Sequence, residues 1–304
     1  MKKIIITGGS GTVGTAFIQK YYEKFEFYNI SRNELQIAEL KRKFPNVKSY
    51  VGDILDLDHL INIFEEVQPD IVIHSAALKH VNLAEENPTE AIKININGSL
   101  NIIKSSIRAQ VPITIGISTD KACDPDSVYG YTKCMMEKMF MEHHNEKTKF
   151  VCTRFANVAN SNGSVIPFWK NLKNQGKPLK LTSDKMNRLM FSKEASAKLI
   201  YDAYEVAYLM KKPFILSNIM KTVNMLDLAK TMSDEIEIVG LRPGEKLNET
   251  LVSERELPYT KVHKNLVFIF NDITLDPGDN LVMEHSSLTA EKMSKTELKK
   301  LSCI

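Results

Sequence analysis

The stretch Lys2–Phe17, KKIIITGGSGTVGTAF, joins an apolar, β-branched run to an amphipathic stretch through a glycine-rich turn. Gly8, Gly11 and Gly14 form a GxxGxxG pattern in it. Glycine suits such a turn because the chain bends tightly, lets a phosphate approach its backbone and packs helix against strand without a Cβ. The stretch therefore predicts a dinucleotide-binding βα unit, and a purely structural glycine turn is the alternative.

The rest of the first half alternates short β-branched runs with longer amphipathic stretches. We expect strands at 2–7, 25–30, 47–52, 70–76, 113–118 and 149–155, and helices at 12–22, 34–43, 57–67, 88–109 and 128–144. This order predicts an α/β fold with a doubly wound parallel (Rossmann) sheet, whose ligand lies beyond the carboxyl ends of the strands.

After about residue 157 the alternation loosens into loop-rich segments. We therefore expect a Rossmann domain over 1–156, with a returning segment near 190–218, and a smaller C-terminal substrate-binding lobe over most of 157–304. The spacing of Ser294 and Glu297 is typical of a capping box and predicts a short terminal helix.

The composition excludes several classes of protein. A net charge of +3 over 304 residues indicates neither a nucleic-acid nor a membrane surface. The four cysteines form no CxxC pair, and His143 and His144 lack the spacing of metal ligands, so we expect free thiols and no metal site. With no leader and no apolar run of bilayer length, the expected location is the cytoplasm.

The ends of the second and third strands bear on the choice of cofactor. The acid that would hold the ribose of NAD is missing after the second strand, where Ser31 and Arg32 could bind a 2′-phosphate instead. This favours NADP, and the alternative is that Arg32 is an exposed cation at a helix start. Asp53, after the third strand, could accept from the adenine amino group or cap a helix.

The fifth expected strand ends in STDKACDPDSVYGYTK, Ser118–Lys133. Tyr129 and Lys133 are spaced i, i+4 and share a helix face, so the ammonium should lower the phenol pKa from about 10 and favour a general base. Tyr131 faces away from Lys133. The preceding Asp120 and Lys121 could equally be a turn-capping acid and an exposed lysine.

At these motifs the chain resembles the extended short-chain dehydrogenases/reductases, and more closely the inverting UDP-N-acetylglucosamine 4,6-dehydratases of polysaccharide biosynthesis. The resemblance covers nearly the whole chain, in the strings TGGSGTVG, SRNEL, HSAALKHVNLAEENPTEAIKININGS, STDKACDPDSVYGYTK, RFANVANSNGSVIP, DKMNRLMF and GLRPGEKLNETL. Departures are mild: Asp124 stands where asparagine is common, Tyr131 where alanine is common, and Ala156 where glycine is common.

The resemblance implies roles in a reaction that first oxidises the sugar at C4, which makes the C5 proton acidic. Tyr129 would take the C4 hydroxyl proton while Thr119 bonds the same oxygen, and Lys133 would tune the phenol and hold the nicotinamide ribose. Lys121 would take the C5 proton. Asp120 would protonate the leaving C6 hydroxyl, although a neighbouring lysine normally keeps an aspartate ionised.

The resemblance also implies binding residues, and a homo-oligomer. Those expected at NADP are Gly8, Ser10, Gly11, Thr12, Val13, Gly14, Ser31, Arg32, Asp53, Ile54, Ala76, Ala77, Lys79, Asn95, Tyr129 and Lys133. Those expected at a UDP-sugar are Lys79, His80, Asn157, Arg188, Arg242 and Glu245. Apart from the resemblance, Arg188 could be a surface cation.

Lys121 also bears on stereochemistry. Retaining relatives usually carry Asp-Glu where this chain has Asp120-Lys121. A lysine with a flexible stem and an easily lowered pKa can remove one proton and allow delivery of another from a different direction. We therefore expect C5 inversion. A retaining 4,6-dehydratase, a nucleotide-sugar 4-epimerase and a non-enzymatic NADP-sensing protein are the alternatives; the Asp120–Lys121 pair argues against the second, and intact Thr119, Tyr129 and Lys133 against the third.

Overall fold

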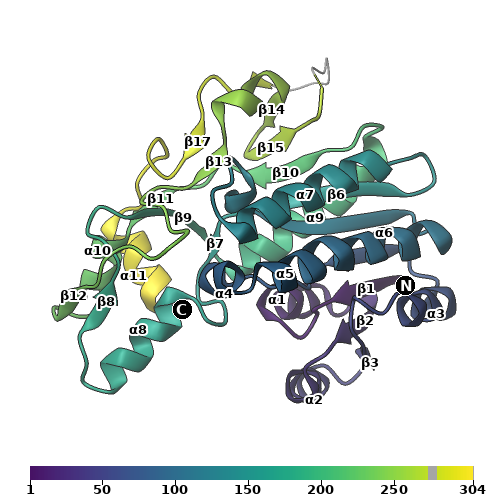
Figure 1. Ribbon diagram of the computed structural model, residues 1–304, viewed down its shortest axis with the longest axis horizontal. Coiled ribbons are helices and arrows are strands. Elements are labelled where there is room, and N and C mark those ends of the chain that lie inside the picture. Colours follow the sequence, from purple (N-terminus) through teal and green to yellow (C-terminus); the bar gives the residue numbers. More distant parts are fainter. Residues whose placement is uncertain (273–278, 304) are drawn as a thin grey trace.

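A ten-stranded sheet in the order β16-β14-β15-β10-β6-β5-β4-β1-β2-β3 dominates the fold (Figure 1). The computed structural model describes residues 1–272 and 279–303, with only the backbone of Cys303. The strands are β1 (Lys2–Thr7), β2 (Phe25–Ser31), β3 (Lys48–Val51), β4 (Ile71–His74), β5 (Ile113–Thr119), β6 (Lys149–Phe155), β10 (Ile215–Asn218), β14 (Thr260–His263), β15 (Leu266–Ile269) and β16 (Asp279–Asn280). Neighbours from β3 to β10 are parallel, and β15, β14 and β16 add antiparallel pairs. The order β3-β2-β1-β4-β5-β6 confirms the predicted doubly wound sheet.

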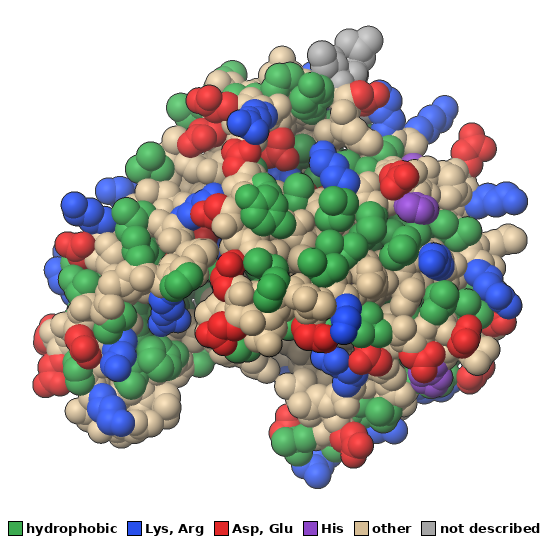
Figure 2. Space-filling view, viewed as in Figure 1, with side chains coloured by type: hydrophobic (Ala, Val, Ile, Leu, Met, Phe, Trp, Pro, Cys, Tyr) green, Lys and Arg blue, Asp and Glu red, His purple; other side chains and the backbone are tan. Residues whose placement is uncertain are grey.

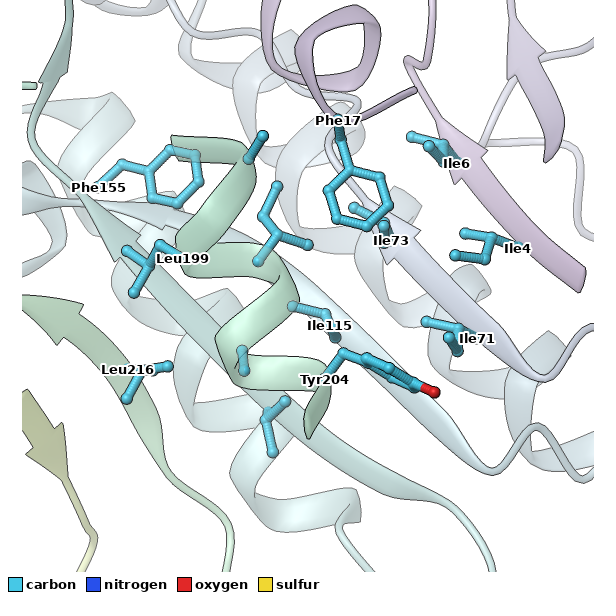
Figure 3. Packing of buried hydrophobic residues seen from close by; sticks show 14 of the residues in the cluster. Ile4, Ile6, Phe17, Ile71, Ile73, Ile115, Phe155, Leu199, Tyr204 and Leu216 are labelled. Atoms are coloured by element: carbon cyan, nitrogen blue, oxygen red, sulfur yellow. The ribbon is translucent and has the colours of Figure 1, made fainter. Parts of the chain in front are cut away.

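Helices cover both faces of this sheet because successive strand side chains point to opposite faces. One layer contains α1 (Thr12–Tyr21), α2 (Glu34–Lys43) and α9 (Lys193–Leu209), and the other contains α3 (Leu57–Val67), α6 (Gly98–Arg108) and α7 (Val128–His143). Ile4 and Ile6 pack in the same cluster as Phe17 of α1 and Tyr204 of α9 (Figure 3). Ile5, between them, packs with the α3 layer.

The helix expected at 88–109 is interrupted. The structure has α4 (Val81–Glu86), which was not predicted, then α5 (Pro88–Ile92), a five-residue π-helical turn η1 (Lys93–Asn97) and α6. The turn contains Asn95, whose buried side-chain oxygen accepts from the Leu78 N–H at 2.8 Å. Its amide donates to Leu78 O at 3.0 Å and to Thr132 Oγ1 at 2.9 Å. Asn95 thereby ties the loop after β4 to α7.

A smaller lobe with its own apolar core stands beside the sheet, at the left of Figure 1. The remaining elements are β7 (Asn157–Val158), α8 (Val165–Asn174), β8 (Leu179–Leu181), β9 (Asn187–Phe191), β11 (Thr222–Asn224), α10 (Met225–Lys230), β12 (Ile236–Ile238), β13 (Thr250–Val252), η3 (Glu254–Tyr259), β17 (His285–Ser286) and α11 (Lys295–Cys303). The lobe's core includes the fully buried Trp169 of α8. The domain boundary at residue 156 stays a prediction.

The terminal helix begins with the predicted capping box. The Glu297 N–H donates to Ser294 Oγ at 3.3 Å, and the Ser294 N–H donates to Glu297 Oε2 at 2.7 Å. Across 1–272 and 279–303, no helix combines the length and apolar character that crossing a bilayer requires.

Candidate active site

Two adjoining cavities open at the carboxyl ends of the parallel strands, where a doubly wound sheet binds its ligand. Their volumes are about 750 Å³ and about 680 Å³, and His80, Asn157, Ser161 and Gly163 line both. Figure 2 shows this side of the molecule hollowed between the smaller lobe at lower left and the helices of the large sheet. The two cavities can hold two ligands end to end.

Most of the predicted site residues meet at these cavities. Those that line the first are Gly8, Ser10, Gly11, Thr12, Val13, Ser31, Arg32, Ile54, Ala76, Ala77, Lys79, His80, Thr119, Asp120, Lys121, Tyr129, Lys133 and Asn157. Those that line the second are His80, Asn157, Arg188, Arg242 and Glu245. The predicted residues that line neither are Gly14, Asp53 and Asn95.

Each of these three has another contact. A Cβ on Gly14 would lie 2.5 Å from the Gly9 Cα, so glycine there allows the turn to pack on the helix. Asp53 forms an ion pair with Arg32 at 3.1 Å, and the helix cap that we considered for it is supplied by Asp56 of α3. Asn95 makes the buried contacts described above.

The glycine turn has the shape of a phosphate cradle. Gly8 has a φ of +69°, and a Cβ there would lie 3.1 Å from the Ala76 backbone, so the position requires glycine. Gly11 precedes α1 and offers no capping side chain, which leaves the first N–H groups of the helix free for an anion. These features fit the diphosphate of a dinucleotide.

The end of β2 places a hydroxyl and a guanidinium beside this cradle. The buried Ser31 Oγ accepts from Ser10 Oγ at 3.0 Å and donates to Asn29 Oδ1 at 2.8 Å. Arg32 is exposed apart from its contact with Asp53, so its guanidinium can turn toward a ligand phosphate.

The turn after β5 (η2, Asp120–Ala122) brings the candidate acid and base together. Asp120 is 1% exposed, and its Oδ1 accepts from Thr119 Oγ1 at 2.9 Å and from Lys121 Nζ at 3.1 Å. Its buried Oδ2 has no hydrogen-bond partner in the described part of the chain. One carboxylate oxygen is therefore fixed by two hydrogen bonds, and the other is buried without one among the described residues. The alternative of a turn-capping acid with an exposed lysine is wrong, because both side chains line the cavity.

Tyr129 and Lys133 line the same cavity from α7. The expectation that Lys133 lowers the pKa of the Tyr129 phenol is nevertheless wrong. Burial raises the pKa of Tyr129 to about 12, Lys121 lowers it and Asp120 raises it. The Lys133 Nζ lies 2.9 Å from Met136 Sδ, and burial lowers its pKa to about 8. The cation that acts on the phenol is thus Lys121.

The expectation that the pKa of Lys121 is easily lowered is also wrong. Its Nζ lies 3.1 Å from Asp120 Oδ1 and 3.3 Å from Glu249 Oε1. Burial lowers the pKa of Lys121, but the two carboxylates more than offset this and raise it above its ordinary value. Its stem is therefore held at both sides rather than free to swing.

Glu249 is a site residue that the sequence did not indicate. It is 5% exposed, lies just before β13, and its Oε1 is 4.0 Å from Arg188 Nη2. Burial raises the pKa of Glu249, as does the Asp120 carboxylate, whereas Lys121 and Arg188 lower it. A single glutamate between an asparagine and a threonine carries no local signal, since only the fold places it beside Lys121.

Arg188 of β9 is not the surface cation that we considered. It is 6% exposed, and its guanidinium donates to the backbone oxygens of Asn187, Lys246 and Leu247 at 2.8–3.1 Å. These bonds fix the RPGEK segment beside the second cavity. Lys79 lines the first cavity and donates to Asn162 O at 2.8 Å, and burial lowers its pKa.

Comparison with known proteins agrees with this geometry. A family model described as "Polysaccharide biosynthesis protein" matches residues 4–271. The chain belongs to this family. It is 35% identical to an inverting UDP-N-acetylglucosamine 4,6-dehydratase of Campylobacter jejuni, over 92% of this chain and 86% of the relative. The predicted family resemblance is confirmed.

Other known proteins are also similar. A UDP-glucose 4-epimerase of Rickettsia bellii is 32% identical, over 84% of this chain and 79% of the relative. The solved structure of Pen from Bacillus thuringiensis is 29% identical, with a TM-score of 0.90 over 99% of this chain and 96% of that one. DesIV, a dTDP-glucose 4,6-dehydratase of Streptomyces venezuelae, is 17% identical with a TM-score of 0.70 over 81% and 88%, and shares the fold.

Proposed function

We propose that this member of the polysaccharide biosynthesis family is a UDP-GlcNAc 4,6-dehydratase that inverts C5. Its product would be UDP-2-acetamido-2,6-dideoxy-β-L-arabino-hexos-4-ulose, for the biosynthesis of surface-glycan sugars. The observation that carries the proposal is the cluster of Thr119, Asp120, Lys121 and Tyr129 around one cavity. Its support from known proteins is the 35% identity to a relative with this activity.

The first cavity would hold NADP. Residues 8–13 would hold the diphosphate, Ser31 and Arg32 the 2′-phosphate, and Lys133 the nicotinamide ribose. The bound nicotinamide supplies a hydride acceptor for C4 and a hydride donor for C6. The second cavity, with the buried Arg188, would take the UDP, because a guanidinium matches the geometry of a diphosphate.

The residues of the chain move the protons. Tyr129 takes the C4 hydroxyl proton, with Thr119 bonding the same oxygen, and Lys121 then takes the C5 proton. Asp120 donates a proton to the leaving C6 hydroxyl. Lys121 can pass a proton to Asp120 across their 3.1 Å separation, which converts ammonium and carboxylate into the required amine and acid.

This arrangement favours dehydration over the alternatives. A 4-epimerase would use Tyr129 and the C4 ketone, but it has no step that needs an acid paired with a base at C6 and C5. A retaining dehydratase would return the C5 proton to the same face, and Lys121 rather than glutamate favours inversion. A non-enzymatic NADP-sensing protein would have no use for the Asp120–Lys121 pair. Incubation with UDP-GlcNAc followed by NMR of the product tests the proposal, and an unchanged or merely 4-epimerised sugar would contradict it.

NADP specificity gives a prediction about Arg32. Arg32→Ala should weaken NADP binding about tenfold and leave NAD binding unchanged, because it removes one charge-assisted bond of about 1.5 kcal/mol to the 2′-phosphate. Arg42→Ala, which removes an exposed arginine from the end of α2, is the control. Dissociation constants for both cofactors provide the measurement. Equal affinity of the wild type for NADP and NAD would exclude the specificity.

The cytoplasmic location, the homo-oligomer and the division into a Rossmann domain over 1–156 and a substrate lobe over 157–304 stay predictions beside this proposal.

A further inference from the structure

Lys121 lies between two carboxylates that come from distant parts of the chain. Asp120 precedes it in the same turn, and Glu249 approaches from the other side, with Nζ–O distances of 3.1 and 3.3 Å. Lys121 lines the first cavity, whereas Glu249 lines neither cavity. A ligand in the cavity would meet Lys121 first.

The backbone presents Glu249 rigidly to this position. The Glu249 N–H donates to Ser287 Oγ at 2.9 Å, and its carbonyl accepts from the Ser287 N–H at 2.8 Å. The adjoining β13 pairs with β17 and packs against the η2 turn that carries Lys121. The carboxylate is therefore held by the fold and not by a mobile loop tip.

Resting on the proposed function, we propose that Glu249 is a positioning residue for Lys121 that stabilises the ammonium formed when Lys121 takes the C5 proton. In this step the C5–H bond breaks and an Nζ–H bond forms. The C5–H electron pair becomes the C5–C6 double bond, and the C6–O bond breaks as Asp120 protonates the leaving hydroxyl to water. Lys121 changes from neutral to positive, 3.3 Å from the Glu249 carboxylate.

The other charged and titratable groups around Lys121 are less suited than Glu249 to stabilise its ammonium. Asp120 acts as the acid. Arg188 is a cation that lowers the pKa of Lys121, and Tyr129 is a phenol that lines the cavity from α7. The two carboxylates raise the pKa of Lys121, so removing the charge of Glu249 should lower it. A glutamate with a purely structural role would not move the titration of Lys121.

The test is the titration of Lys121 in the substrate-free protein, followed by NMR of ¹³Cε-labelled lysine and assigned with Lys121→Arg. Glu249→Gln should lower the pKa of Lys121 by about 1–3 units. It should also lower kcat about 10²-fold with KM unchanged, because Glu249 lines neither cavity. Glu249→Asp should give a smaller change in the same direction. If the Gln variant does not fold, the titration is measured in this variant instead. Glu254→Gln, which removes an exposed charge nearby, is the control.

An unshifted Lys121 titration in both Glu249 variants, or an equal shift in Glu254→Gln, would overturn the role of Glu249. A wild type that does not dehydrate UDP-GlcNAc would overturn the proposed function and, with it, the catalytic part of the role. The two failures are distinguishable because the titration needs no substrate.

Discussion

Tyr129→Phe is expected to lower the turnover of UDP-GlcNAc ~10²-fold or more, because it removes the group that takes the C4 hydroxyl proton and keeps the ring that packs in the site. The phenol lines the same cavity as Thr119 and Lys121. The substitution should stop the first oxidation, so no reduced cofactor should form when substrate is added. The initial rate of ketone formation, followed by NMR, gives the measurement.

Tyr131→Phe is the matched control, since it makes the same change on the same helix. Tyr131 is 59% exposed and lines neither cavity. The turnover of Tyr131→Phe should therefore equal that of the wild type. Turnover of Tyr129→Phe within a few-fold of the control would remove Tyr129 from the mechanism.

Lys121→Ala is expected to block elimination, also by ~10²-fold or more, while NADP still binds. Lys121 does not take the C4 hydroxyl proton, so the C4 oxidation should continue, although more slowly because Lys121 no longer lowers the pKa of Tyr129. Adding UDP-GlcNAc should therefore leave NADPH accumulated on the enzyme. This result differs from that of Tyr129→Phe, in which no NADPH should form. Absorbance of the reduced cofactor in a single turnover therefore separates the two roles.

The alanine variant leaves Asp120 and Glu249 as buried carboxylates without their cation, which can cost about 3–5 kcal/mol of stability. Lys121→Arg is the companion variant, because it keeps the positive charge but cannot act as a base near neutral pH. It should fold, bind NADP and accumulate NADPH as the alanine variant does. Wild-type turnover in either variant would exclude Lys121 as the base.

The large sheet was predictable because its signals are local. Ile4, Ile5 and Ile6 are buried in layers on both faces, which produces the continuous apolar run typical of a central parallel strand. The predicted bounds of α2 and α3 agree with the structure for a similar reason: side chains of Asn33 and Asp56 cap their first turns.

The parts that were not predicted depend on contacts between distant segments. The π-helical turn η1 contains Asn95, which contacts Leu78 and Thr132, and no helical pattern within 88–109 reveals those partners. Glu249 meets Lys121 only because β13 packs against the turn after β5. The raised pKa of Lys121 has the same origin in part, because Glu249, which is distant in the sequence, adds to the effect of the adjacent Asp120.

The reaction of UDP-GlcNAc in D₂O, stopped early and followed by NMR, tests the proposed inverting dehydration most directly. We expect a 4-keto-6-deoxy product of L-arabino configuration with deuterium at C5, and no net change in NADPH. Deuterium enters at C5 because the proton returned there comes from a group that has exchanged with D₂O, and its delivery from a different direction gives the L-arabino configuration. An early product exclusively of D-xylo configuration, or NADPH formed in proportion to the substrate consumed, would contradict it.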